Sequence, residues 1–131
     1  MSTIKTINIV NELYDNKVSD NWNNLHHRIK LYFEWMINDI KDRRNVHHFG
    51  CLQIRRDVRD GRLTTLAIEL SDGLPPYDTA WYAEVGEYIR DSLLNNNKVV
   101  LPNVATIEKK KDGSISVTLS KHMRDYLNKV K

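Results

Sequence analysis

The sequence predicts an α+β fold in which two N-terminal helices precede ββα-ββα, forming a four-stranded antiparallel sheet with helices mainly on one face. Three observations support this fold class. Residues 19–42 carry a long apolar stripe of helical period, two alternating stretches each turn at an Asp-Gly pair, and a capped amphipathic segment follows each stretch. We expect a single domain over 1–131, with a helical pair in 1–45 and the ββα-ββα part in 49–131.

The N-terminal part predicts two helices. Residues 3–14 have apolar side chains at helical spacing, and Ser19 is placed to cap the longer helix of residues 19–42. One face of that helix is continuously apolar, formed by Trp22, Leu25, Ile29, Phe33, Met36 and Ile40. Further apolar residues lie off this stripe, namely Leu31, Tyr32, Trp35 and Ile37. The helix is therefore either central to the fold, which we favour, or carries a second surface for a partner.

Residues 49–70 predict a β-hairpin that turns at Asp60-Gly61. A two-residue loop would pair polar with apolar side chains on one face. A three-residue loop that begins at Arg59 pairs apolar with apolar residues, and burial should select this register. The expected pairs are Ile54 with Leu66 and Leu52 with Ile68.

Residues 104–119 repeat this pattern with the loop Lys111-Asp112-Gly113, which sets Ile107 opposite Val117 and Ala105 opposite Leu119. A helix capped by Asp78 or Thr79 lies between the hairpins and stops at Asn95-Asn96-Asn97. Ser120 caps a last helix. The shared basic-Asp-Gly turn leaves an internal duplication open.

Composition limits the class of protein. The single Cys51 cannot form an internal disulfide, no apolar run is long enough to span a bilayer, and no secretory signal opens the chain. We therefore expect a cytoplasmic protein with no membrane partner. Thirteen Asn and eleven Ile suggest an AT-rich genome, such as that of a phage or a low-GC bacterium. For a phage protein the compartment is the host cytoplasm.

The net charge of +3 is distributed unevenly. Residues 41–62 carry seven basic and three acidic side chains, whereas residues 63–96 carry one basic and six acidic. Residues 97–131 are again basic, with eight basic and three acidic side chains. Such segregation favours an oriented partner.

Basic side chains gather around the two predicted turns. Protruding basic hairpins suit nucleic acid, because Arg and Lys neutralise phosphates and a β-ribbon fits a groove. If both turns face one way, they form one positive surface. The opposing interpretation is that both turns are solvated and that their basic side chains form ion pairs with Asp57, Asp60 and Asp112. The candidate nucleic-acid-binding residues are Arg43, Arg44, Arg55, Arg56, Arg59, Arg62, Lys109, Lys110 and Lys111.

An aromatic, acidic helix offers a different kind of site. Trp81 and Tyr82 adjoin Glu84 and Glu87, and an exposed aromatic ring among acidic residues can be a protein-binding hot spot. Trp35, off the apolar stripe of the long helix, is a third candidate. The opposing interpretation places these rings partly in the core with their polar tips outward.

Enzymatic and metal sites have little support. The doublets His26-His27 and His47-His48 are weak candidates for metal ligands or nuclease residues, because one cysteine and no second acid or base at fixed spacing accompany them. RNP, KH and zinc-finger patterns, Gly-rich phosphate loops and nucleophile elbows do not occur in the sequence. We therefore assign no catalytic residue, no metal and no cofactor.

Together these features predict a small non-enzymatic binding protein, encoded by a phage or mobile element, that contacts nucleic acid or a ribonucleoprotein through basic β-hairpins. The first alternative is an inhibitor or adaptor of a host enzyme that acts through the acidic aromatic helix, with a homodimer possible. The second alternative is a small His-dependent nuclease.

Overall fold

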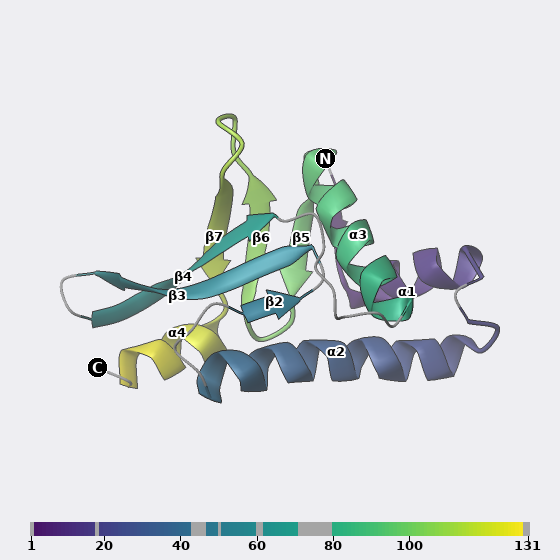
Figure 1. Ribbon diagram of the computed structural model, residues 1–131, viewed down its shortest axis with the longest axis horizontal. Coiled ribbons are helices and arrows are strands. Elements are labelled where there is room, and N and C mark those ends of the chain that lie inside the picture. Colours follow the sequence, from purple (N-terminus) through teal and green to yellow (C-terminus); the bar gives the residue numbers. More distant parts are fainter. Residues whose placement is uncertain are drawn as a thin grey trace.

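The computed structural model describes residues 2–17, 19–42, 47–49, 51–59, 62–70 and 80–129, and the fold class is α+β (Figure 1). These ranges contain four helices and seven strands. In chain order the elements are β1 (Thr3–Ile4), α1 (Thr6–Asp15), α2 (Trp22–Asp42), β2 (His47–Phe49), β3 (Leu52–Arg59), β4 (Arg62–Leu70), α3 (Ala80–Leu94), β5 (Lys98–Leu101), β6 (Ala105–Lys109), β7 (Ile115–Leu119) and α4 (Lys121–Lys129).

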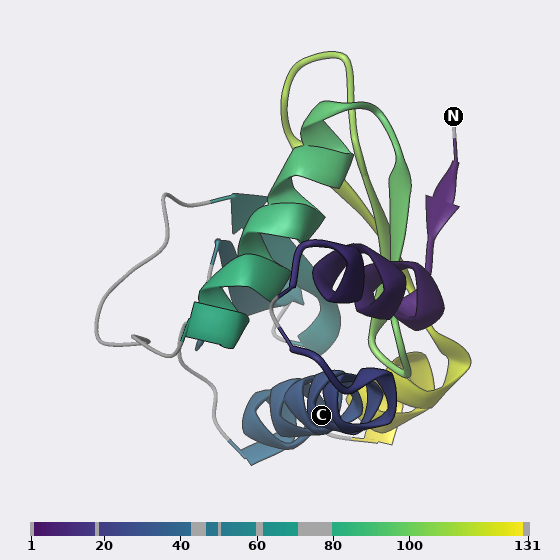
Figure 2. The ribbon, with the colours of Figure 1, turned by 90° about the vertical axis from the view of Figure 1, so that its right-hand side faces the viewer.

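The strands form two sheets, so the prediction of one four-stranded antiparallel sheet is wrong in its arrangement. The larger sheet has the order β1-β5-β6-β7, with β1 parallel to β5, and the smaller sheet has the order β2-β3-β4. The cause is strand β5, which the prediction missed. It occupies the free edge of β6, so the first hairpin has no place there, and β4 instead lies beside β7. Helices α1 and α3 pack together on one face of the larger sheet (Figure 2).

The first hairpin differs from its predicted register. Arg59 pairs with Arg62, which leaves two residues between them, and the register then shifts between Asp57 and Val58. This β-bulge adds one residue to β4 and restores apolar pairing in the body of the hairpin. The observed pairs there are Leu52 with Leu70, Ile54 with Ile68 and Arg56 with Leu66. By alternation along β3, Arg56 lies on the same buried face as Leu52 and Ile54.

The second hairpin confirms its prediction. Ala105 pairs with Leu119, and Ile107 with Val117. The Gly113 N–H donates to the Lys110 carbonyl at 3.0 Å, and Gly113 has φ of +91°, the left-handed conformation that ends a three-residue loop.

The helix ends follow the sequence closely, with one correction. The cap of α2 is Asn21, whose side-chain oxygen accepts the Asn24 N–H at 2.9 Å, and not Ser19. The predicted cap of α4 is confirmed, because the Ser120 hydroxyl accepts the Met123 N–H at 3.2 Å. Helix α3 ends as expected in the Asn triplet, where Asn96 takes φ of 66°.

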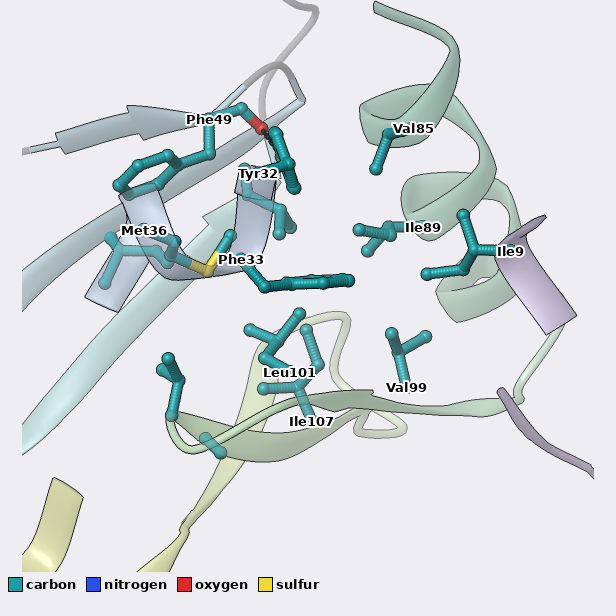
Figure 3. Close-up of a cluster of buried hydrophobic side chains, with 14 of the residues drawn as sticks. Ile9, Tyr32, Phe33, Met36, Phe49, Val85, Ile89, Val99, Leu101 and Ile107 are labelled. Carbon is teal, nitrogen blue, oxygen red and sulfur yellow. Dashed lines mark hydrogen bonds between the residues drawn. The ribbon is translucent and has the colours of Figure 1, made fainter. Parts of the chain in front are cut away.

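Helix α2 is the centre of the core (Figure 3). Tyr32, off the main stripe, is fully buried, and its hydroxyl donates to the Phe49 carbonyl of β2 at 3.0 Å. Side chains of α1, α3 and both sheets join the same buried cluster. Helix α2 is thus buried on a second side, as expected for a helix that is central to the fold, although Leu31 stays 46% exposed. No helix within the described ranges combines the length and apolar character needed to cross a bilayer.

The first prediction concerns this buried hydroxyl. Tyr32→Phe should lower the free energy of unfolding by about 1–2 kcal/mol, because it leaves the buried Phe49 carbonyl without that donor. Urea denaturation measures the change. Tyr14→Phe is the matched control, since Tyr14 is 39% exposed, and should change stability by less than about 0.5 kcal/mol. Equal effects of the two changes would contradict the assigned role of the Tyr32 hydroxyl.

Candidate nucleic-acid interface

Arg56 holds the C-terminal end of α2. Its guanidinium donates from Nε to the Ile40 carbonyl at 2.8 Å and from Nη2 to the Lys41 carbonyl at 2.6 Å. These carbonyls lie in the last turn of the helix, where a cation also opposes the negative end of the helix dipole. The residue is 8% exposed. Arg56 is therefore a structural residue, and its assignment to the phosphate-contacting set is corrected.

Tyr126 joins α4 to the C-terminal end of α2. Its hydroxyl donates to the Lys41 carbonyl at 2.9 Å, and its ring lies 5.6 Å from the Arg56 guanidinium carbon. The Lys41 ammonium lies 5.2 Å from the ring centroid and 2.7 Å from His122 Nε2. An ammonium can only donate, so the histidine nitrogen accepts. The end of α2, strand β3 and α4 thus meet at one junction.

This junction brings together two basic segments that are far apart in the sequence. Residues 41–62 carry seven basic and three acidic side chains, and residues 121–131 carry four basic and one acidic. Lys121 and Arg124 are exposed on α4, and Lys41 is half-buried beside them. Figure 1 shows the end of α2, helix α4 and the outer part of the β3–β4 hairpin at one end of the molecule. We call Lys41, Arg55, Lys121 and Arg124, with the hairpin that carries Arg55, the basic end.

The other cations predicted for this region are placed to different degrees. Arg55 is exposed and, by strand alternation, faces away from the side that Arg56 faces. Arg59 and Arg62 form the last pair of the β3–β4 ladder, but their side chains lie outside the described structure. Arg43 and Arg44 lie wholly outside the described residues.

The lysines of the second hairpin belong to a separate surface. Lys110 and Lys111 are exposed and Lys109 is half-buried. This hairpin projects upward in Figure 1, whereas the β3–β4 hairpin extends to the left, so the two turns do not form the one surface expected from the sequence. At its tip, the Asp112 carboxylate accepts the Ser114 hydroxyl at 2.6 Å and the Ser114 N–H at 3.0 Å. These bonds, with a smaller contribution from Lys110, lower the pKa of Asp112.

Of the three predicted protein-binding residues, the structure describes the side chain of Trp35 alone. Trp35 is half-buried, with its ring edge-to-face against Phe49 at 4.7 Å, so it completes the contact between α2 and β2. The backbone of Trp81 and Tyr82 lies in α3, but their side chains lie outside the described structure. Further along α3, Arg90 bonds Asp91 at 3.3 Å and the Cys51 sulfur at 3.4 Å. The role of the two α3 aromatics stays a prediction.

The histidine doublets lie on different elements. His26 and His27 are on α2, where the His26 ring lies 5.1 Å from that of Trp22, whereas His47 and His48 form part of β2. The side chains of His47 and His48 are not described. Within the described ranges no three His, Cys, Asp or Glu side chains gather closely enough to hold a metal ion.

No family model, curated protein or solved structure matches the chain. The sequence had indicated the first hairpin, but it missed Lys41, Lys121 and Arg124, because only the docking of α4 through Tyr126 places them together. The one sequence signal that could have pointed to α4 was the excess of basic over acidic side chains in residues 97–131.

The second prediction tests the Arg56 junction. Arg56→Met should lower the free energy of unfolding by about 2–4 kcal/mol, because the bonds to two helix carbonyls are lost. Arg124→Met removes an equal charge from an exposed site and should cost less than about 0.5 kcal/mol. Chemical denaturation of both variants at one pH measures the difference. Arg56→Met at or near wild-type stability would show that the guanidinium does not hold the junction.

The third prediction concerns Asp112. Ser114→Ala removes the hydroxyl that contributes most to lowering this carboxyl's pKa, so the Asp112 pKa should rise toward its usual value. NMR titration of the carboxyl carbon measures it. Ser116→Ala on β7 is the control and should leave the titration unchanged. An unmoved Asp112 pKa in Ser114→Ala would contradict the described turn.

Proposed function

We propose that this protein is a small non-enzymatic binding protein that holds the phosphate backbone of nucleic acid, alone or in a ribonucleoprotein, with its basic end. The observation that carries the proposal is the junction of Arg56, Tyr126 and Lys41, which fixes α4 against the end of α2. The junction gathers exposed cations from two segments into one region. A chain of phosphates is the natural partner for several cations held at fixed spacing.

The shape of the basic end supports the same partner. A two-stranded antiparallel arm extends beyond the body of the molecule and carries Arg55 on the face turned away from Arg56. Lys121 and Arg124 lie on α4, which contacts β4 of the same arm. A β-ribbon fits the major groove of a duplex, whose two backbones then lie on either side of it. Cations from both the arm and the neighbouring helix suit that arrangement.

The internal electrostatics leave the two exposed cations of α4, Lys121 and Arg124, available for a ligand. Arg56 itself opposes the dipole at the end of α2, so the helix end does not require the α4 cations. Neither Lys121 nor Arg124 uses its side chain in a hydrogen bond or ion pair within the described structure. Their charge is therefore directed to solvent, where a polyanion can displace counterions.

The fourth prediction tests this proposal by fluorescence polarisation with labelled single-stranded DNA, duplex DNA and RNA. The double variant Lys121→Glu, Arg124→Glu should weaken binding at low salt by about tenfold or more. The slope of log affinity against log salt should decrease in magnitude by about two, because roughly two phosphate contacts are lost.

The matched control changes net charge equally at a distant site. Lys5→Glu with Lys98→Glu alters two exposed lysines near β1 and β5, and should change affinity by less than about threefold. Lys110→Glu with Lys111→Glu asks separately whether the second hairpin contributes. The proposal is wrong if no nucleic acid binds at low salt, or if the control pair weakens binding as much as the α4 pair.

A further inference from the structure

A cavity of about 260 Å³ is lined by α2, the start of α1 and the turn between β5 and β6. In Figure 2, α2 passes beneath the other two elements. Its lining combines one stripe of α2 with residues of these two other elements. The lining residues are Thr6, His26, Lys30, Phe33, Glu34, Ile37, Pro102 and Asn103. The volume is slightly below the ~300 Å³ at which sites for drug-sized ligands begin, so a smaller organic molecule fits it.

The inner part of the cavity is apolar. Phe33, Ile37 and Pro102 supply hydrocarbon surface, and Phe33 belongs to the buried core, which fixes its ring. Pro102 and Asn103 form a tight turn closed by the Val104 N–H on the Leu101 carbonyl at 2.9 Å, with Asn103 at φ of 59°. These walls are held by the fold, so an apolar ligand would not need to order them.

The rim of the cavity is polar, and both of its basic residues come from α2. Lys30 lies one helical turn after His26, and Thr6 adds a hydroxyl from the first turn of α1. The His26 ring rests 5.1 Å from Trp22, whose indole N–H donates to Asn11 at 2.8 Å. The imidazole thus lies beside an indole ring that is hydrogen-bonded to α1. Glu34, one turn beyond Lys30, is the only acidic residue of the lining.

The Lys30 ammonium is available to a ligand. Glu34 is at the spacing that often pairs with lysine on a helix, yet no hydrogen bond or ion pair joins Lys30 to any described residue. An apolar cavity beside an unpaired ammonium, an imidazole and a hydroxyl is complementary to a molecule with an apolar body and one anionic head. The head belongs at the His26 and Lys30 end, and the body against Ile37.

We propose that this cavity binds a small carboxylic acid with an aromatic or branched aliphatic body. The site is independent of the proposed nucleic-acid interface. The carboxylate accepts from Lys30 and Thr6, and the apolar body lies on Phe33, Ile37 and Pro102. Glu34 repels a second anionic group and therefore favours monocarboxylates over dicarboxylates.

The fifth prediction uses 3-phenylpropanoate as the probe, with amide chemical shifts of the full chain as the readout. Saturable shifts should concentrate at residues 6, 26–37 and 102–103, with a Kd on the order of 1 mM for a ligand of this size. The uncharged 3-phenylpropanol should bind at least about fivefold more weakly, because it lacks the charge that Lys30 contacts.

Three single changes on α2 separate charge at the site from charge elsewhere. Lys30→Gln should raise the Kd for the acid by about fivefold or more, and Glu34→Gln should lower it by about twofold or more. Arg28→Gln is the control, since Arg28 is exposed and does not line the cavity, and the Kd should stay within about twofold.

Several results would overturn the assignment. The absence of saturable shifts, or shifts centred on the basic end, would remove the site. Equal affinity for the alcohol and the acid, or a Kd unchanged in Lys30→Gln, would show that no carboxylate is recognised. All three variants replace solvent-accessible side chains. An amide spectrum of each unliganded variant that matches the wild-type spectrum verifies that the variant is folded.

Discussion

The fold depends on one buried cation. A guanidinium taken out of water is costly unless each donor finds a partner, and Arg56 finds its partners in the carbonyl groups that end α2. The guanidinium therefore supplies hydrogen-bond donors to the carbonyl groups at the end of α2, and the negative end of the helix dipole stabilises its positive charge. Tyr126 adds a third element by donating to the same Lys41 carbonyl. The long helix, the small sheet and the last helix are joined at this point.

The consequence for function is an arrangement of charge that neither basic segment produces alone. Exposed lysine and arginine on α4 come to lie beside the end of α2 and the arm of the first hairpin. The second hairpin projects elsewhere, and its Asp112 is engaged by Ser114 rather than by a lysine. The cavity beneath α1 lies apart from both, with its own small set of charges. The molecule thus carries separate surfaces that differ in their chemistry.

Much of the fold could be predicted because its signals are local. The α2 stripe, the caps at Ser120 and the Asn triplet, and the loop at Gly113 each depend on residues close in sequence. The pairing register of the first hairpin could not be predicted from such local signals. Its bulge inserts one residue between the pairs 57 with 65 and 58 with 63, and the only sign is a break in alternation between Leu63 and Leu66. The bulge sets Arg56 opposite Leu66, while alternation along β3 places Arg56 on the buried face with Ile54.

The site was harder to predict than the fold, because it depends on contacts over long sequence separations. Arg56 looks like its neighbour Arg55 in the sequence, and only strand parity separates a buried cation from an exposed one. Strand β5 is Lys98 followed by three apolar residues, a sequence that could equally extend a loop, yet this strand decides which edges of the sheets remain for pairing. Lys30 and Thr6 come together only through the packing of α1 on α2.

The basic end is tested most directly by an NMR footprint of a short oligonucleotide on the protein, with the Nε–H signal of Arg56 observed alongside the backbone amides. We expect shifts at residues 41–42, 55–59 and 121–129, while the Arg56 signal keeps its position and its slow exchange with water. A footprint on residues 109–115 or on α3, or an Arg56 signal that moves with the ligand, would contradict a basic end built around a buried arginine.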